Sequence, residues 1–231
     1  DELTDTVSGI EFRLIHVPGE TNDQICMWLP EKRVLIAADN IYRAFPNLYT
    51  IRGTPYRDLT QWTNSLERMR GLGAEHLIPC HTGPVSGRER IRHLLTDYRD
   101  AIAYVNDQTI RGMNAGLTPD ELAAEIQLPP HLAGHPWLQE FYGTVAWSVR
   151  AVYHGNLGWF DGNPANLFPL PPGEKAEKMA RLAGGKSSLL ARAKAACENG
   201  EYQWVLELTD HLLRLDPESE PVAALRVQAL T

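Results

Sequence analysis

The chain has 231 residues, 43% of them hydrophobic and 22% charged, which is enough apolar content for one or two domains with cores of their own. Its formal net charge of −7, from 22 basic and 29 acidic side chains, opposes a phosphate backbone, so we expect no nucleic-acid partner. No run approaches the roughly 18 uninterrupted apolar residues that a membrane span needs, so we expect no transmembrane segment.

The first part of the chain predicts strands and one helix. Between Gly9 and Val17, Ile10, Phe12 and Leu14 alternate with charged residues, which predicts a half-buried strand with these three side chains on its buried face. Short apolar runs bounded by turn residues predict further strands, and a three-and-four spacing of apolar residues predicts an amphipathic helix. The strands are expected at residues 24–29, 34–38 and 76–80, and the helix at 57–72.

From residue 88 onward the patterns are helical. Thr118 followed by Pro119 and by Glu121 three residues later is a capping box that opens a helix, and further helices are predicted at 88–113 and 138–157. The connector 157–167 is rich in Gly, Pro and Asn but carries large aromatic side chains, so we expect it to pack against the protein.

The last part, residues 174–230, alternates helices and turns. Its run from Gly200 to Pro217 resembles a tetratricopeptide hairpin. A single such unit cannot bury its own apolar face and must pack on neighbouring helices or on a second chain. We therefore predict a helical dimerisation or scaffolding region.

Three side chains that can bind metal follow three apolar runs. Glu20 lies in a loop between two predicted strands, Asp39 follows the run 35–38, and His81 follows the run 76–80. Strand ends place such groups in loops that can converge on a cation. The alternatives are a solvated turn carboxylate for Glu20, a helix cap for Asp39 and a satisfied polar side chain for His81.

The loop 46–57 is rich in hydrogen-bond donors. It holds Asn47, Arg52 and Arg57, and a planar guanidinium suits a tetrahedral oxyanion such as sulfate or phosphate. The alternative is an ordinary surface loop in which Arg57 pairs with Asp58 or Glu20.

The run from Pro18 to Gly53 resembles the alkylsulfatases of the metallo-β-lactamase superfamily, which hydrolyse alkyl sulfate esters with two zinc ions. The segments 106–109, 142–145 and 157–167 resemble the helical dimerisation domain of that family. The resemblance implies an α/β part, residues 1–87, that is a partial metallo-β-lactamase αββα sandwich. An all-α dimerisation domain with a tetratricopeptide-like hairpin, residues 88–231, follows it.

The resemblance also assigns roles to individual residues. It implies that Glu20, Asp39 and His81 are zinc ligands, with Asp39 standing where the family usually has Glu. It implies that Asn47 and Arg52 bind the sulfate, and Arg57 falls near the ester oxygen. The segment 80–84 departs from the His-His-Trp-Pro of many members, so that wall of the site differs.

The expected reaction follows from the resemblance: a metal-bound hydroxide attacks an alkyl sulfate and releases alcohol and inorganic sulfate. No H-x-H-x-D-H cluster exists among the eight histidines, so we expect it upstream and interpret the chain as the middle of a longer protein. A homodimer and a periplasmic or secreted location are also implied. Two alternatives stay open: another hydrolase of this fold, acting on a lactone, thioester or phosphoester, or an inert helical dimerisation module.

Overall fold

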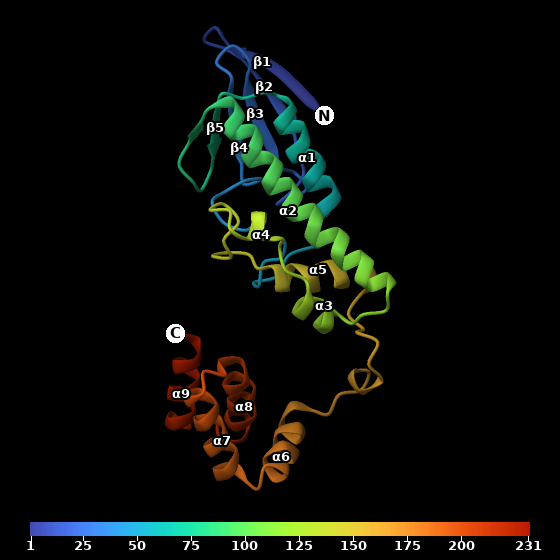
Figure 1. Cartoon of the computed structure of the whole chain (residues 1–231), viewed down its shortest axis with the longest axis vertical. Coiled ribbons are helices and arrows are strands. Elements are labelled where there is room, and N and C mark those ends of the chain that lie inside the picture. Colours follow the sequence, from blue (N-terminus) through green and yellow to red (C-terminus); the bar gives the residue numbers. More distant parts are fainter. The chain divides into compact units, whose positions relative to one another are not determined.

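The computed structural model describes all 231 residues and divides into two compact units, Asp1–Gly162 and Asn163–Thr231. The first is a six-stranded sheet with helices packed on it, and the second consists of helices (Figure 1). This confirms the predicted fold class of an α/β part followed by a helical part. The contacts divide the chain at Gly162 because the helices after residue 88 share the core of the sheet. The domain boundary between residues 87 and 88, which the family resemblance implies, stays a prediction.

The strands of the sheet lie in sequence order, and only β4 and β5 are parallel. A parallel pair needs a crossover connection, and helix α1 (Leu59–Gly71) provides it. The four predicted strands are present, and the first and last strands of the sheet, of six and two residues, were not predicted. The strands are β1 (Glu2–Val7), β2 (Ile10–His16), β3 (Ile25–Leu29), β4 (Val34–Ala38), β5 (His76–Pro79) and β6 (Val85–Ser86).

The buried face of β2 is the opposite of the predicted one. Ile15 and Val17 are fully buried, whereas Ile10 is 44% exposed. Both faces of this strand carry apolar side chains, so the alternation could not decide which face packs on the helices. The other face of the sheet carries an apolar row whose members are paired in register and all remain partly or largely exposed: Leu3, Leu14, Met27, Ile36 and Ile78.

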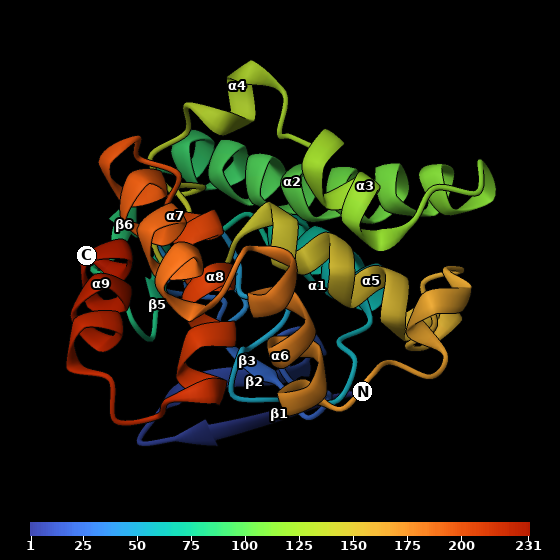
Figure 2. The same ribbon diagram turned by 90° about the horizontal axis from the view of Figure 1, so that it is seen from below.

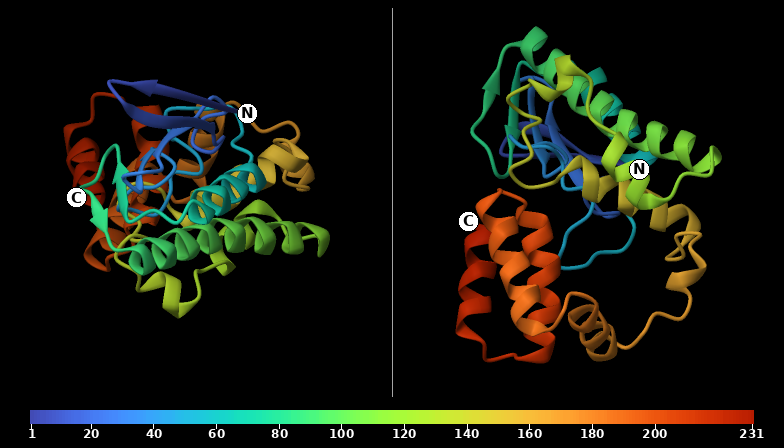
Figure 3. Two further views of the ribbon diagram at one scale, coloured as in Figure 1. Left: turned by 90° about the horizontal axis from the view of Figure 1, so that it is seen from above. Right: turned by 60° about the horizontal axis from the view of Figure 1, so that its bottom comes forward.

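Two helices cover the buried face of the sheet. Helix α1 begins after Asp58, whose side chain accepts a hydrogen bond from the backbone of Gln61 at 3.0 Å, and it buries Trp62. Helix α2 (Arg88–Asn114) lies beside α1 and buries Tyr98. Figure 3 shows the pair lying along the sheet. Helix α2 confirms the prediction at 88–113.

Three further helices complete the first unit: α3 (Pro119–Glu125), α4 (Pro130–Ala133) and α5 (Val145–Leu157). The capping box of Thr118 and Glu121 is present at the start of α3. Helix α5 packs on α2 and α3 (Figure 2). It is shorter than the predicted helix 138–157, because residues 139–143 instead bond to the loop 44–46. The Phe45 N–H donates to the Gln139 carbonyl at 2.8 Å, and the Gly143 N–H donates to the Phe45 carbonyl at 3.3 Å.

The second unit contains a short 3-10 helix, η1 (Pro164–Asn166), and four α-helices. These are α6 (Pro172–Leu182), α7 (Lys186–Glu198), α8 (Tyr202–Leu215) and α9 (Glu220–Leu230). Helix α8 contacts the other three and buries Val205 and Leu208 among them.

The connector 157–167 is not packed as predicted, since Leu157 is 57% and Trp159 is 68% exposed. None of the helices combines the length and apolar character needed to cross a bilayer.

Candidate metal and oxyanion site

Five of the six predicted site residues line one pocket of about 620 Å³. The pocket lies where the loop after β2 and the ends of β4 and β5 meet, so residues far apart in the sequence face each other. Its lining consists of Glu20, Thr21, Asp39, Tyr42, Arg43, Ala44, Arg52, Arg57, His81, Thr82 and Tyr142. The three metal-binding candidates, Arg52 and Arg57 therefore line the same pocket, and their roles there stay predictions.

Asp39 and His81 are in direct contact at the ends of the parallel strands. The Nδ1 atom of His81 lies 2.6 Å from Oδ1 of Asp39, and this hydrogen bond, with the negative charge of Asp39, raises the pKa of the imidazole. Ala38, just before, has a φ of 52°, in the left-handed region, where a non-glycine residue is uncommon. The turn there makes Asp39 face the pocket. No helix follows for Asp39 to cap, which excludes that alternative.

Glu20 is largely withdrawn from water and faces Arg57. The distance between Oε1 of Glu20 and Nη1 of Arg57 is 3.3 Å, and the side chains are 14% and 8% exposed. Burial raises the pKa of Glu20; Arg57 lowers it in part, and the nearby charge of Asp39 raises it further. The surface-loop alternative named Asp58 or Glu20 as the ion-pair partner of Arg57, and the structure has the pair with Glu20.

Arg57 also closes the loop that carries Asn47. Its Nη1 donates to the main-chain carbonyl of Asn47, and its Nε has no hydrogen-bond partner. The N–H of Asn47 donates to the hydroxyl of Tyr42 at 2.6 Å. Asn47 is only 4% exposed and does not line the pocket, whereas Arg52 is exposed within it. Of the two residues that the resemblance pairs as sulfate ligands, Arg52 thus lines the pocket and Asn47 is linked to it through Arg57, and their role toward sulfate stays a prediction.

Sequence patterns did not identify several residues of the pocket wall. Tyr42 and Tyr142 meet edge to face with ring centroids 5.8 Å apart, and Tyr142 comes from the loop before α5, a hundred positions further along the chain. The backbone N–H of Arg43 donates to the hydroxyl of Thr82 at 2.9 Å. No local pattern marks such residues, because long-range contacts alone bring them to the pocket.

The side chains can be tested for their fit to a metal ion. No group of three or more His, Cys, Asp and Glu side chains is arranged around a common point for a metal, since His81 bonds to Asp39 and Glu20 pairs with Arg57. The chemistry of the donors nevertheless suits a cation. Two carboxylates and an imidazole face one pocket, where the charge of Asp39 raises the pKa of Glu20, and a bound divalent ion would offset the repulsion between the carboxylates. These residues fit part of a ligand set.

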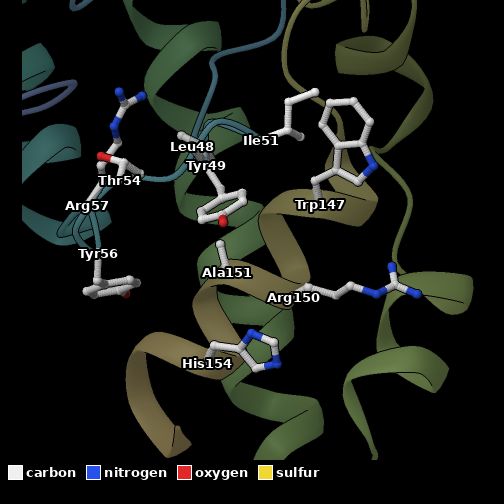
Figure 4. Close-up of a pocket in the computed structure, with 10 residues that line it drawn as sticks. All are labelled: Leu48, Tyr49, Ile51, Thr54, Tyr56, Arg57, Trp147, Arg150, Ala151 and His154. Atoms are coloured by element: carbon white, nitrogen blue, oxygen red, sulfur yellow. The ribbon is translucent and has the colours of Figure 1, made fainter. Parts of the chain in front are cut away.

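A second pocket, of about 360 Å³, lies on the other side of Arg57. Figure 4 shows Tyr49 and Ile51 of the loop facing Trp147 and Ala151 of helix α5. Its lining is mainly apolar, with Arg57 as the residue shared with the first pocket. A charged and an apolar pocket therefore adjoin each other along the loop 48–57.

Two family models match the chain. The model described as Metallo-beta-lactamase superfamily matches residues 1–81, and the model described as Alkyl sulfatase dimerisation matches residues 118–231. The first match contains Glu20, Asp39 and His81, and the second contains Tyr142 and the helices of the second unit.

Several characterised proteins are similar to the chain. A linear primary-alkylsulfatase of Pseudomonas sp. is 46% identical over 222 residues, which cover 95% of this chain and 42% of that protein. An (R)-specific secondary-alkylsulfatase of Pseudomonas sp. is 37% identical over 231 residues, covering 97% of this chain and 35% of that protein. The solved structure of a stereoselective inverting sec-alkylsulfatase from Pseudomonas sp. matches with a TM-score of 0.94 at 36% identity, covering 99% of this chain and 37% of that one. The chain thus spans about two fifths of the length of these relatives.

Proposed function

The chain belongs to the alkylsulfatase family of the metallo-β-lactamase superfamily, and from this premise we propose that its charged pocket is part of a zinc-dependent site that hydrolyses alkyl sulfate esters to alcohol and inorganic sulfate. One observation carries the proposal: two carboxylates, an imidazole and three guanidiniums, drawn from four segments, line a single pocket. A metal-assisted attack on a sulfate ester needs side chains that bind a cation next to side chains that bind an anion.

Glu20, Asp39 and His81 would hold the metal as part of a larger ligand set, since two zinc ions need more than three protein ligands. A bound zinc supplies Lewis acidity and lowers the pKa of a water molecule. Before the metal binds, Arg57 offsets the charge of buried Glu20, and Asp39 holds the imidazole of His81 in place.

Arg52 and Arg57 would bind the sulfate group and stabilise the negative charge that grows on its oxygens. Arg57 is held for this role by the carbonyl of Asn47, so Asn47 supports the anion site through its main chain. The apolar pocket between the loop and helix α5 offers the alkyl tail a surface away from water. The adjoining pockets thus match the two ends of an amphiphilic anion.

The exposed apolar row of the sheet supports the sandwich assignment. Leu3 and Ile78 at its ends are 59% and 38% exposed, and such a face is normally covered. We propose that the second layer of an αββα sandwich covers it in the whole enzyme. We also propose a homodimer through the helical region, in line with the match to a dimerisation model, and a periplasmic or secreted location.

The proposal is tested by grafting. The 231 residues replace the matched segment of the Pseudomonas linear primary-alkylsulfatase, and the chimaera is assayed on dodecyl sulfate, on the matching phosphate ester and on a lactone. We expect sulfate hydrolysis with bound zinc. A folded, zinc-loaded chimaera that cleaves the phosphate or the lactone instead would establish the alternative hydrolase, and one inert to all three would leave only the dimerisation module.

Arg52→Ala in this chimaera should lower kcat about a hundredfold or more, the scale of losing one oxyanion donor, and leave bound zinc unchanged. Arg192→Ala is the matched control, because Arg192 is an exposed arginine of α7 in the second unit. Kinetics of Arg52→Ala equal to those of the control would remove Arg52 from the mechanism.

A further inference from the structure

Asn40, the residue after Asp39, is a polar side chain with no exposed surface. Its Oδ1 accepts a hydrogen bond from the backbone N–H of Glu20 at 3.2 Å, and its Nδ2 donates to the carbonyl of Val17 at 2.6 Å. Its own carbonyl accepts from the indole Nε1 of Trp62 at 3.1 Å. The side-chain amide therefore bonds at both ends to the loop that carries Glu20.

The loop fits closely against this amide. A Cβ atom added at Gly19 would lie 2.9 Å from Cγ of Asn40 and 2.8 Å from Cδ1 of Trp62, and closer still to Oδ1 of Asn40. From the other side, the hydroxyl of Ser65 in helix α1 donates to the carbonyl of Pro18 at 2.7 Å. The backbone just before Glu20 is thus held between Asn40 and α1.

Glu20 and Asp39 line one pocket, and two carboxylates that share a pocket repel each other. Something must hold them at a fixed separation until a cation arrives. The backbone at Ala38 turns Asp39 toward the pocket and Asn40 toward the interior, so one turn orients one acid and the amide that holds the other.

We propose that Asn40 is a positioning residue of the metal site, which fixes the Glu20 backbone relative to Asp39 and so sets the spacing of the two carboxylates. This inference rests on the proposed function, since it assigns a role toward the metal. This positioning role differs from a role in general stability, because the side-chain hydrogen bonds of Asn40 are made to the loop that carries Glu20 and not to the strand that precedes Asn40. Groups that orient metal ligands in this way typically change metal affinity by about 10 to 100-fold when removed.

The test uses the 231-residue chain with Asn40→Ala, which removes both bonds, and Asn40→Asp, which keeps the size and the acceptor but removes the Nδ2 donor. Thr109→Val is the matched control. Thr109 is also fully buried, but its hydroxyl donates to the carbonyl of Val105 in its own helix, so the control removes a buried hydrogen bond away from the pocket.

The first measurement is amide hydrogen exchange, which needs no metal. The Glu20 amide should exchange about tenfold faster or more in Asn40→Ala than in the wild-type chain or Thr109→Val, while the amide of Leu35 in β4 keeps its protection. Asn40→Asp retains the acceptor and should keep more of the Glu20 protection, so it also serves if Asn40→Ala does not fold. Equal Glu20 exchange in wild-type and folded Asn40 variants would overturn the proposal.

The second measurement is the zinc affinity of the same variants in the chimaera with the Pseudomonas alkylsulfatase, which supplies the rest of the ligand set, by competition with a chelator. Asn40→Ala should bind zinc about tenfold more weakly or worse, and Thr109→Val should stay within about twofold of wild type. Equal losses in the two variants, or faster Glu20 exchange with unchanged zinc affinity, would refute the positioning role. A chimaera with the wild-type Asn40 that binds no zinc would count against the zinc site itself, and the exchange result would still decide whether Asn40 fixes the loop.

Discussion

Gly143→Ala tests whether the loop before helix α5 is an integral wall of the pocket. A Cβ atom at this position would lie 2.7 Å from the carbonyl carbon of Pro46 and 2.8 Å from Cα of Asn47, with the Pro46 oxygen closer still. These are backbone atoms and cannot move away as the end of a flexible side chain could. The neighbouring Tyr142 lines the pocket, and Arg57 bonds to the Asn47 carbonyl, so the displacement would reach the anion site.

Three contributions decide whether Gly143→Ala raises or lowers the free energy of unfolding. Gly143 does not adopt a left-handed φ, so alanine would stabilise it by about 0.4–1 kcal/mol if there were space. Overpacking against backbone costs about 1–3 kcal/mol. The two hydrogen bonds of Phe45 with Gln139 and Gly143 contribute about 0.5–1.5 kcal/mol each and would be strained or lost. The net expectation is a loss of about 1–5 kcal/mol.

The assay is equilibrium unfolding of the 231-residue chain in urea, with Gly134→Ala as the control. A Cβ at Gly134 would lie 3.5 Å from the Pro130 carbonyl oxygen, an ordinary contact, and its φ of −81° suits alanine. We expect the control to be neutral or slightly stabilised. If Gly143→Ala unfolded with the same free energy as the control, the close packing of loops 44–47 and 139–143 would be wrong.

Three further predictions concern stability. Hydrogen bonds and charge from Arg70 and Arg99 lower the pKa of Glu67 from 4.5 to about 2. The interactions of ionised Glu67 with the two arginines should therefore stabilise the fold fully above pH 4.5, and this stabilisation should fade as the pH falls toward 2. Glu67→Gln should therefore cost about 1 kcal/mol or less at pH 7, because the side chain is 45% exposed and screened, and much less at pH 2, as urea titrations at the two pH values would reveal. Thr118→Ala removes the cap of α3 and should cost about 0.5–2 kcal/mol in urea unfolding, whereas no change would mean that the capping box contributes nothing. Leu208→Ala opens a cavity in the second unit and should cost about 2–5 kcal/mol, measured as faster amide exchange in α8, with unaltered exchange contradicting its place in that core.

The sequence by itself determined the local structure and the chemistry available to the site. Periodicity placed four strands and the main helices, because the backbone periods of strands and helices leave a direct mark on the spacing of apolar residues. The capping box of Thr118 and Glu121 was readable for the same reason, since both partners lie within one helical turn. Strand ends likewise indicated Glu20, Asp39 and His81 as groups that could converge.

Tertiary structure decided which of these groups meet and which faces are buried. The more apolar face of β2, with Ile10, Phe12 and Leu14, is not the buried one, so only packing against α1 and α2 selected Ile15 over Ile10. The ion pair of Arg57 with Glu20, and the arrival of Tyr142 at the pocket, depend on contacts between residues tens of positions apart. No local pattern encodes such contacts, because their energy is gained only once the whole core has formed.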